Sequence, residues 1–129
     1  MYHTIVIVGN VGRDPEMRYT PSGSAVTSFS VAVSDGFGER KKTIWFRVSA
    51  WEKLAETCNN YLKKGSKVLI EGRLNATDTG NPRTYNRQDG TTTASFEVTA
   101  NVVRFLSSRT ESDESEDVDG PDDGSEIPF

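Results

Sequence analysis

Apolar and polar residues alternate with a period of two along several stretches of the chain, which is the pattern of strands that bury one face. Residues 3–12 are rich in β-branched side chains and contain two glycines, which indicate bends or close backbone approach. Residues 28–34, 66–74 and 95–102 alternate more regularly. The apolar side chains expected on their inner faces are Phe29, Val31 and Val33, then Val68, Ile70 and Leu74, and then Phe96, Val98, Ala100 and Val102.

Residues 52–65 have helical spacing instead, with Leu54, Ala55, Cys58 and Leu62 on one stripe. Lys63 and Lys64 fit the last turn of this helix, and Gly65 fits its end. Turn-forming residues mark loops at 21–23, 35–42 and 77–90. These elements predict an all-β protein with the OB-fold, a five-stranded Greek-key barrel with one helix between strands 3 and 4.

The segment TIWFRVSAW, residues 43–51, carries the most informative alternation. If it forms a strand, its inner side chains are Ile44, Phe46, Val48 and Ala50, and its outer side chains are Thr43, Trp45, Arg47, Ser49 and Trp51. Two tryptophans beside an arginine on a polar face suit unpaired nucleic acid, because bases stack on aromatic rings while cations neutralise phosphates. The rings could instead be covered by a loop, by the helix or by another subunit, and a β-bulge could turn Trp51 inward.

Two loops repeat this combination of one aromatic residue among cations. Phe37 precedes Arg40, Lys41 and Lys42 at the tip of an apparent hairpin, and Tyr85 lies between Arg83 and Arg87. Either loop alone is typical of a solvated turn, but both together beside a Trp-Arg-Trp face favour nucleic-acid binding. Single strands are favoured over duplexes, because reading base edges in a groove usually requires a helix or a two-stranded ribbon.

Charge divides the 129 residues into two parts. Residues 1–109 hold all 15 Lys and Arg against 10 acids, a charge of +5, whereas residues 110–129 hold nine acids and no cation. A basic body with an acidic tail is typical of proteins that bind nucleic acid. We therefore expect one folded domain over 1–109 and a disordered acidic tail over 110–129. The tail ends on Ile127-Pro128-Phe129, which either folds back onto the body or is presented to a partner.

The chain offers little for catalysis. It has one histidine and no Gly-x4-Gly-Lys-Ser/Thr phosphate loop, and residues 117–124 imitate a calcium loop without the ligands at its later positions. We expect no enzyme activity, no metal and no cofactor. A lone cysteine, Cys58, suits a reducing compartment, and no apolar run reaches the length of a membrane span, so we expect a cytoplasmic protein with no membrane partner.

Three quoted segments give the chain a family resemblance. IVIVGNVGRDPEMRYTPSGSAVTSFSVAVS, WFRVSAWEKLAETCNNYLKKGSKVLIEGRL and the final acidic IPF together resemble the bacterial single-stranded-DNA-binding proteins, over nearly all of residues 3–106 and again over the last eight. The resemblance implies an OB-fold protomer that assembles as a homotetramer. It also implies a nucleoid-associated protein that binds single-stranded DNA, without strong sequence preference, in replication, repair and recombination.

The resemblance also implies site residues by position. The stacking residues would be Phe37, Trp45, Trp51 and Tyr85, and the cationic contacts would be Lys41, Lys42, Arg47, Lys53, Lys64, Arg83 and Arg87. The docking tip for helicases, primase, nucleases and recombination mediators would be Asp122, Asp123, Glu126, Ile127, Pro128 and Phe129. The sequence departs from the family pattern in its short linker, since acids begin at Glu111, and in an acidic run that Gly124 and Ser125 interrupt.

Two other interpretations remain open on sequence grounds. The chain could be an OB-fold protein that prefers single-stranded RNA or acts as a primosome-type accessory protein, because stacking alone does not distinguish RNA from DNA. It could also be a protein-interaction adaptor whose tryptophan face is an assembly interface. A competition titration with matched DNA and RNA oligonucleotides tests the first alternative. Access of a quencher to the tryptophans tests the second.

Overall fold

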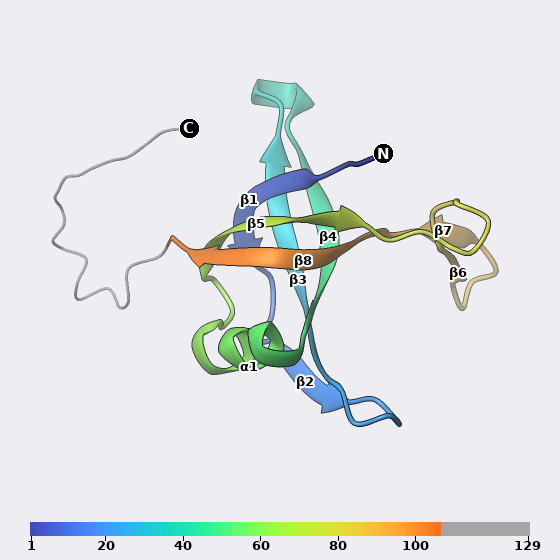
Figure 1. The fold of residues 1–129 in the computed structure, drawn as a ribbon. Helices are drawn as coiled ribbons and strands as arrows, with labels where there is room; N and C mark the ends of the chain where they lie inside the picture. Colours follow the sequence, from blue (N-terminus) through green and yellow to red (C-terminus); the bar gives the residue numbers. More distant parts are fainter. Residues whose placement is uncertain (107–129) are drawn as a thin grey trace, which may run out of the picture.

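Five long strands form the body of the computed structural model, which describes residues 1–106. They are β1 (Ile5–Val11), β3 (Ala25–Asp35), β4 (Lys42–Trp51), β5 (Lys67–Leu74) and β8 (Phe96–Phe105). The shorter elements are β2 (Glu16–Tyr19), β6 (Thr84–Asn86), β7 (Thr92–Ala94), the 3₁₀ turn η1 (Gly38–Arg40) and the helix α1 (Glu52–Tyr61). The β3–β4 and β6–β7 hairpins project from the body in different directions (Figure 1).

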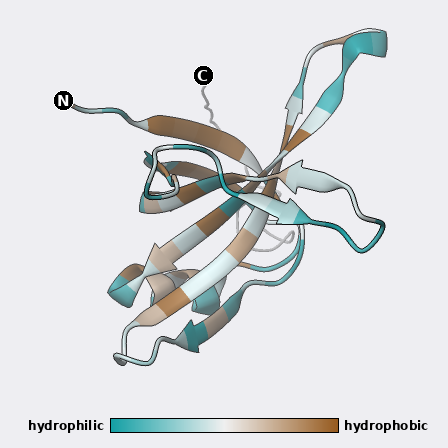
Figure 2. Ribbon diagram, turned by 90° about the vertical axis from the view of Figure 1, so that its right-hand side faces the viewer, coloured by the Kyte–Doolittle hydropathy of each residue, from teal (hydrophilic) through white to brown (hydrophobic). Residues whose placement is uncertain are grey.

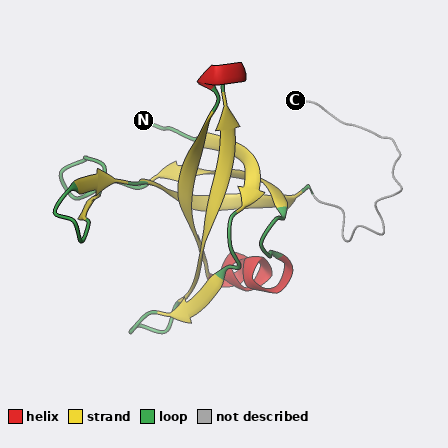
Figure 3. Ribbon diagram, turned by 180° about the vertical axis from the view of Figure 1, so that it is seen from behind, coloured by secondary structure: helices red, strands yellow, loops and turns green. Residues whose placement is uncertain are grey.

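The five long strands close into a barrel. The sheet runs β1-β5-β8-β4-β3-β2, and an additional β1–β3 pairing joins its ends. The β4–β8 pair is parallel, whereas the other barrel pairs are antiparallel. Helix α1 lies between β4 and β5, the third and fourth barrel strands, beside one end of the barrel (Figure 3). The predicted OB-fold is therefore confirmed.

Alternation correctly predicts three of the four side chains of β4 expected in the core, whereas Ile44 is half-buried outside the core cluster. Val48 and Ala50 are fully buried, and Phe46 packs against the core from its half-buried position. The same holds for Phe29 and Val31 of β3. The whole buried cluster consists of Ile7, Val11, Phe29, Val31, Val48, Ala50, Cys58, Leu62, Val68, Ile70, Val98 and Ala100. Strand β4 thus presents its remaining side chains outward, on a rigid part of the barrel.

Helix α1 closes one end of the core with the predicted stripe. Ala55 and Cys58 are fully buried, and the Thr27 hydroxyl donates a hydrogen bond of 2.7 Å to the Ala55 carbonyl. Burial raises the pKa of the Cys58 thiol from 9.0 to about 11, which agrees with a packing role for this residue. Neither helical element within residues 1–106 has the length and apolar run that crossing a bilayer requires.

The helix ends earlier than the sequence predicts. It stops at Tyr61, and Leu62 is already extended, so Lys63 and Lys64 follow the helix instead of forming its last turn. The backbone amide of Lys64 donates a hydrogen bond to the Asp14 carboxylate at 2.9 Å, so this amide has a partner outside the helix. The chain then reverses direction at Gly65, whose φ of +91° is easily adopted only by glycine.

Further predictions of local structure are wrong. Leu74 and Phe96, which the alternation predicts on inner faces, are 49% and 59% exposed. Residues 77–90 are not wholly a loop, because β6 falls within them and pairs with β7 in a small two-stranded sheet. Val102 does not share the inner face with Ala100. The two residues pair with the neighbouring Glu71 and Gly72 of β5, so β8 carries one extra residue there, and Val103 packs against the core instead. A bulge of this kind reverses the alternation beyond it.

Glu52 begins α1 in a conformation that side chains disfavour, with a φ of +56°. The left-handed region costs about 1–2 kcal/mol for a residue with a Cβ, whereas glycine adopts it freely. We expect Glu52→Gly to raise the free energy of unfolding by about 0.5–1 kcal/mol in a urea titration, after the entropic cost of glycine. Glu56→Gly, in the same helix, is the matched control and should lower it by about 1 kcal/mol. A loss of stability in both variants would contradict the strain at Glu52.

Candidate nucleic-acid interface

The outer face of β4 carries both tryptophans of the chain. Trp45 is 53% exposed and Trp51 is 42% exposed, and Arg47 lies exposed between them. The register between β3 and β4 is continuous up to Trp51, so no bulge turns this ring inward. Small residues of β3 pair with this part of β4: Ala32 with Trp45, Ser30 with Arg47 and Ser28 with Ser49. The neighbouring strand therefore leaves the aromatic and cationic side chains accessible.

Gly12 sets the position of the Trp45 ring. A Cβ placed on Gly12 would lie 2.5 Å from Cζ3 and 2.9 Å from Cη2 of Trp45, closer than carbon atoms can approach. The backbone amide of Gly12 is itself fixed by a hydrogen bond of 2.9 Å to the Ser30 carbonyl. The indole thus rests on a backbone segment that cannot easily yield, and its position depends on the missing side chain at residue 12.

We expect Gly12→Ala to displace the Trp45 ring. A stacking base contributes about 1–3 kcal/mol, so losing part of that contact should weaken binding of a deoxythymidine oligomer roughly 3- to 30-fold. Equilibrium titration measures this change, and the tryptophan emission spectrum reports the moved ring. Gly23→Ala is the control for a replaced glycine, because Gly23 has open space around its Cβ position, although its φ, unlike that of Gly12, is positive. Equal affinities for Gly12→Ala and Gly23→Ala would show that the ring position does not matter.

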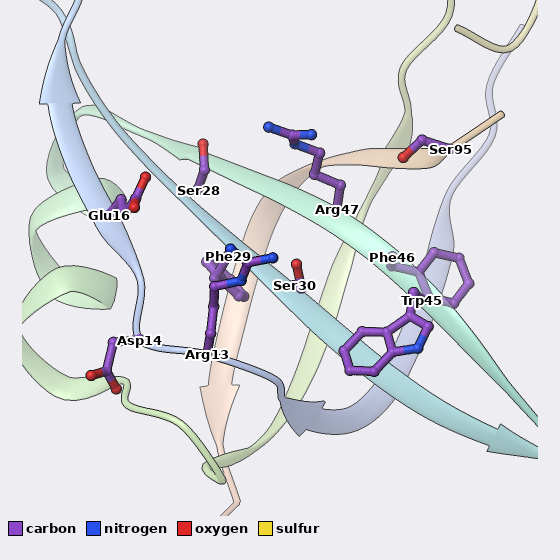
Figure 4. A pocket seen from close by; sticks show the side chains of 10 residues that line it. All are labelled: Arg13, Asp14, Glu16, Ser28, Phe29, Ser30, Trp45, Phe46, Arg47 and Ser95. Carbon is purple, nitrogen blue, oxygen red and sulfur yellow. The ribbon is translucent and has the colours of Figure 1, made fainter. Parts of the chain in front are cut away.

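A hollow of about 390 Å³ lies beside Trp45 (Figure 4). Its lining combines two guanidinium groups, several hydroxyls, two carboxylates and aromatic rings. The lining residues are Arg13, Asp14, Glu16, Ser28, Phe29, Ser30, Trp45, Phe46, Arg47 and Ser95. This volume falls within the usual range of about 300–1,000 Å³ for small-ligand sites. Ring faces next to guanidinium donors can hold a base and its phosphate.

The β6–β7 hairpin brings Tyr85 and Arg83 to the barrel. The Tyr85 hydroxyl donates a hydrogen bond to Oε2 of Glu97 on β8, and Nε of Arg83 lies 3.4 Å from Oε1 of the same carboxylate. The hydrogen bond to Glu97 raises the pKa of Tyr85; burial and the Glu97 charge act in the same direction, while Arg47 and Arg83 oppose them. Arg87, farther along the hairpin, donates from Nη2 to the Thr93 hydroxyl at 3.3 Å.

The β3–β4 hairpin forms a second polar arm. Phe37 is 92% exposed at the start of η1, and Lys41 follows the turn. The Lys42 ammonium lies 3.0 Å from the Asp35 carboxylate across the hairpin, and both side chains are solvated. Figure 2 shows that the tips of both hairpins are hydrophilic, whereas the barrel strands carry the apolar positions. The Asp35 pairing reduces the charge that Lys42 offers to an anionic ligand.

The structure gathers only some of the predicted site residues. Arg47, Arg83 and Tyr85 lie around Glu97, because β4 and β8 pair Arg47 with Glu97 and the hairpin supplies the other two. Trp45 lines the hollow together with Arg47. The remaining predicted residues are spread farther away. Phe37, Lys41 and Lys42 lie on the β3–β4 arm, Arg87 lies in the β6–β7 hairpin, Trp51 and Lys53 lie where β4 meets α1, and Lys64 lies after α1. The predicted docking residues 122–129 lie outside the described residues.

Sequence reasoning missed Arg13 and Glu97. Arg13 lines the hollow beside Trp45, but it sits in a connection between two strands, where a lone cation is ordinary. Glu97 interrupts the apolar and small residues of β8, and a charged residue within a barrel strand is a signal that could have identified it. Within residues 1–106, no group of three or more His, Cys, Asp or Glu side chains is placed to hold a metal ion.

Comparisons with known proteins relate the chain to a protein family. Residues 2–106 match the family described as the single-strand binding protein family. Over 112 residues the chain is 38% identical to a single-stranded DNA-binding protein of Neisseria meningitidis, which covers 83% of this chain and 61% of the relative. A protein of the same name from Oceanobacillus iheyensis is 37% identical over 112 residues, which cover 84% of this chain and 66% of the relative. Single-stranded DNA-binding protein 1 of Chlorobaculum tepidum is 47% identical over 75 residues, or 54% and 46% of the two chains. The chain thus spans about three fifths of the length of the first of these relatives.

Proposed function

The chain belongs to the single-strand binding protein family, and we propose that it binds and protects single-stranded DNA without strong sequence preference. The observation that carries this proposal is the outer face of β4, where two exposed tryptophans flank an arginine. Members of the family bind DNA and are not enzymes. Stacking and phosphate neutralisation require no bond to be made or broken, so the proposed activity needs no catalytic group.

The proposed interface follows β4 from the hairpin arm toward α1. Six residues of strand separate Trp45 from Trp51 by roughly 20 Å, enough for each ring to stack on a different nucleotide. Arg47 and the hairpin cations would neutralise phosphates between the stacked bases. The proposed DNA-binding residues are Phe37, Lys41, Lys42, Trp45, Arg47, Trp51, Lys53, Lys64, Arg83, Tyr85 and Arg87. These residues lie on β4, on both hairpins and around α1, an arrangement that suits a strand that wraps the protein.

We also propose that the two parts of the chain have different functions. Residues 1–109 would bind DNA, and the acidic segment 110–129 would recruit helicases, primase, nucleases and recombination mediators at the nucleoid. In residues 122–129, Ile127 and Phe129 would fill an apolar pocket while Asp122, Asp123 and Glu126 meet basic residues around it. Deleting residues 122–129 should abolish capture of these enzymes without weakening the binding of DNA. Unchanged capture would contradict this role.

Assembly into a homotetramer is a further part of the proposal. Within residues 1–106, Ile5–Gly9 of β1 pair with β5 but with no second strand, since β3 reaches only Asn10 and Val11. Val6 is 57% exposed on this strand. An open edge with apolar side chains is a surface that a second copy can cover. Sedimentation equilibrium should give four times the chain mass of 14.2 kDa, and a monomer at micromolar concentration would contradict the assembly.

Competition binding tests the proposed function. A labelled deoxythymidine oligomer should be displaced readily by unlabelled single-stranded DNA, poorly by duplex, and less well by RNA of matched length. The affinity should fall with salt, with a slope of about −0.7 per phosphate neutralised. Equal competition by RNA would favour the alternative RNA-binding function. Absence of binding to every oligomer would instead favour the adaptor interpretation, in which the tryptophan face is an assembly surface.

A further inference from the structure

A carboxylate lies among the aromatic and cationic side chains of the proposed interface. The Glu97 side chain is only 14% exposed, and β8 places it in register with Arg47 of β4. Burying a negative charge is costly unless it is paired, and a second anion such as a DNA phosphate would raise that cost. Glu97 meets this requirement by accepting from the Tyr85 hydroxyl and lying 3.4 Å from Nε of Arg83.

These contacts attach the β6–β7 hairpin to the barrel. Backbone hydrogen bonds fix the hairpin base, from the Ser95 amide to the Arg83 carbonyl at 3.3 Å and from the Asn75 amide to the Glu97 carbonyl at 2.8 Å. The Glu97 carboxylate also contacts two side chains of the hairpin: Tyr85 in its first strand, β6, and Arg83 just before that strand. One acidic side chain therefore controls where an aromatic ring and a cation of the interface are held.

We propose that Glu97 is a positioning residue, which holds the Tyr85 ring for stacking and keeps Arg83 paired until a DNA phosphate replaces the carboxylate. This inference rests on the proposed function. The two contacts differ in how easily they exchange. The Arg83 side chain is 52% exposed and its nearest contact to Glu97 is 3.4 Å, and exposed pairs of this kind contribute only about 0–1 kcal/mol. The half-buried Tyr85 instead donates to an ionised acceptor, and such charge-assisted hydrogen bonds are roughly twice as strong as neutral ones.

Each contact has a separate consequence for binding. A ring that is held in place loses less rotamer freedom when a base stacks on it, so the Tyr85 anchor favours affinity. When a phosphate takes Arg83, the released Glu97 attracts a cation from solution while the phosphate releases one. The two ion movements nearly cancel, so Arg83 adds little to the salt dependence as long as Glu97 is charged.

Three variants test the proposal in titrations with a deoxythymidine oligomer across a range of salt concentrations. Glu97→Gln keeps an acceptor for Tyr85 but removes the charge, so binding at low salt should become up to about five-fold tighter. Its salt slope should be more negative by about 0.7, the value of one phosphate contact on a single strand. Tyr85→Phe keeps the ring and removes the anchor, so affinity should fall about 2- to 10-fold with an unchanged slope. Glu71→Gln, at an exposed position of β5, is the control for lost charge and should match the wild type.

The double variant Arg83→Gln/Glu97→Gln should lose the additional slope of Glu97→Gln, because no arginine remains to be released. An unchanged slope in Glu97→Gln, or an unchanged affinity in Tyr85→Phe, would overturn the proposal. Thermal melts of all variants separate these outcomes from misfolding, and the affinity of Tyr85→Phe supplies the test if Glu97→Gln does not fold. A wild-type chain that fails to bind the oligomer would refute the proposed function itself. Wild-type binding with failed variant predictions would refute only the role of Glu97.

Discussion

Replacing Trp45 by alanine should weaken binding of a deoxythymidine oligomer about 5- to 150-fold. Stacking of one base on an aromatic ring contributes about 1–3 kcal/mol, and each 1.4 kcal/mol corresponds to a factor of ten in the dissociation constant. Trp45 has the features of a stacking platform, because it is half exposed, rests on the Gly12 backbone and adjoins both Arg47 and the hollow lined by Arg13. Equilibrium titration at fixed salt measures the loss.

The same variant should leave the fold intact, because the removed ring lies outside the core. Tyr61→Ala is the matched control. Tyr61 is also an exposed aromatic residue, but it lies on α1 against Phe105, away from the outer face of β4. Its loss should change the affinity less than two-fold. Similar losses in Trp45→Ala and Tyr61→Ala would mean that general surface hydrophobicity, and not this face of β4, drives binding.

Replacing Ile70 by alanine should lower the free energy of unfolding by about 2–5 kcal/mol. Ile70 is the largest of the fully buried side chains, and its strand β5 pairs it with Ile7 of β1 and Val103 of β8. Removing the side chain leaves a cavity where three barrel strands meet, and the closed strands cannot collapse fully around it. Urea unfolding followed by circular dichroism measures the change.

Leu74→Ala is the control for this prediction, because Leu74 lies on the same strand but is about half exposed. It should cost about 1 kcal/mol or less. The DNA affinity of folded Ile70→Ala should match the wild type, since the interface lies on the outer side of the barrel. Equal destabilisation by the two variants would contradict the identification of Ile70 as a central core residue.

The alternation of β4 predicted on which side of the barrel most of its side chains lie. Where a strand has one buried face, inner and outer side chains separate by position alone, and this placed Val48 inside and Trp45 and Trp51 outside correctly. The stripe of α1 was equally clear, because Ala55 and Cys58 recur at helical spacing. These elements are long and regular, so local pattern and tertiary packing require the same arrangement.

Other features depend on contacts that no local pattern carries. The bulge in β8 exchanges Val102 for Val103 at the core because it arises from pairing with β5 across the sheet. Strands β6 and β7 have three residues each, too few to show alternation. The importance of Arg13 and Glu97 appears only when segments distant in sequence meet, at the hollow and at the hairpin base. The predicted direct contact of the hairpin cations with DNA stays a prediction.

Tryptophan fluorescence during titration with a deoxythymidine oligomer tests the central claim most directly. The chain has two tryptophans, both on the outer face of β4, so its emission reports this face alone. We expect deep quenching by the single strand at low and moderate salt, weak effects from duplex and RNA, and a partial signal in each of Trp45→Phe and Trp51→Phe. Emission that stays unchanged at both salt concentrations would contradict binding of single-stranded DNA at this face.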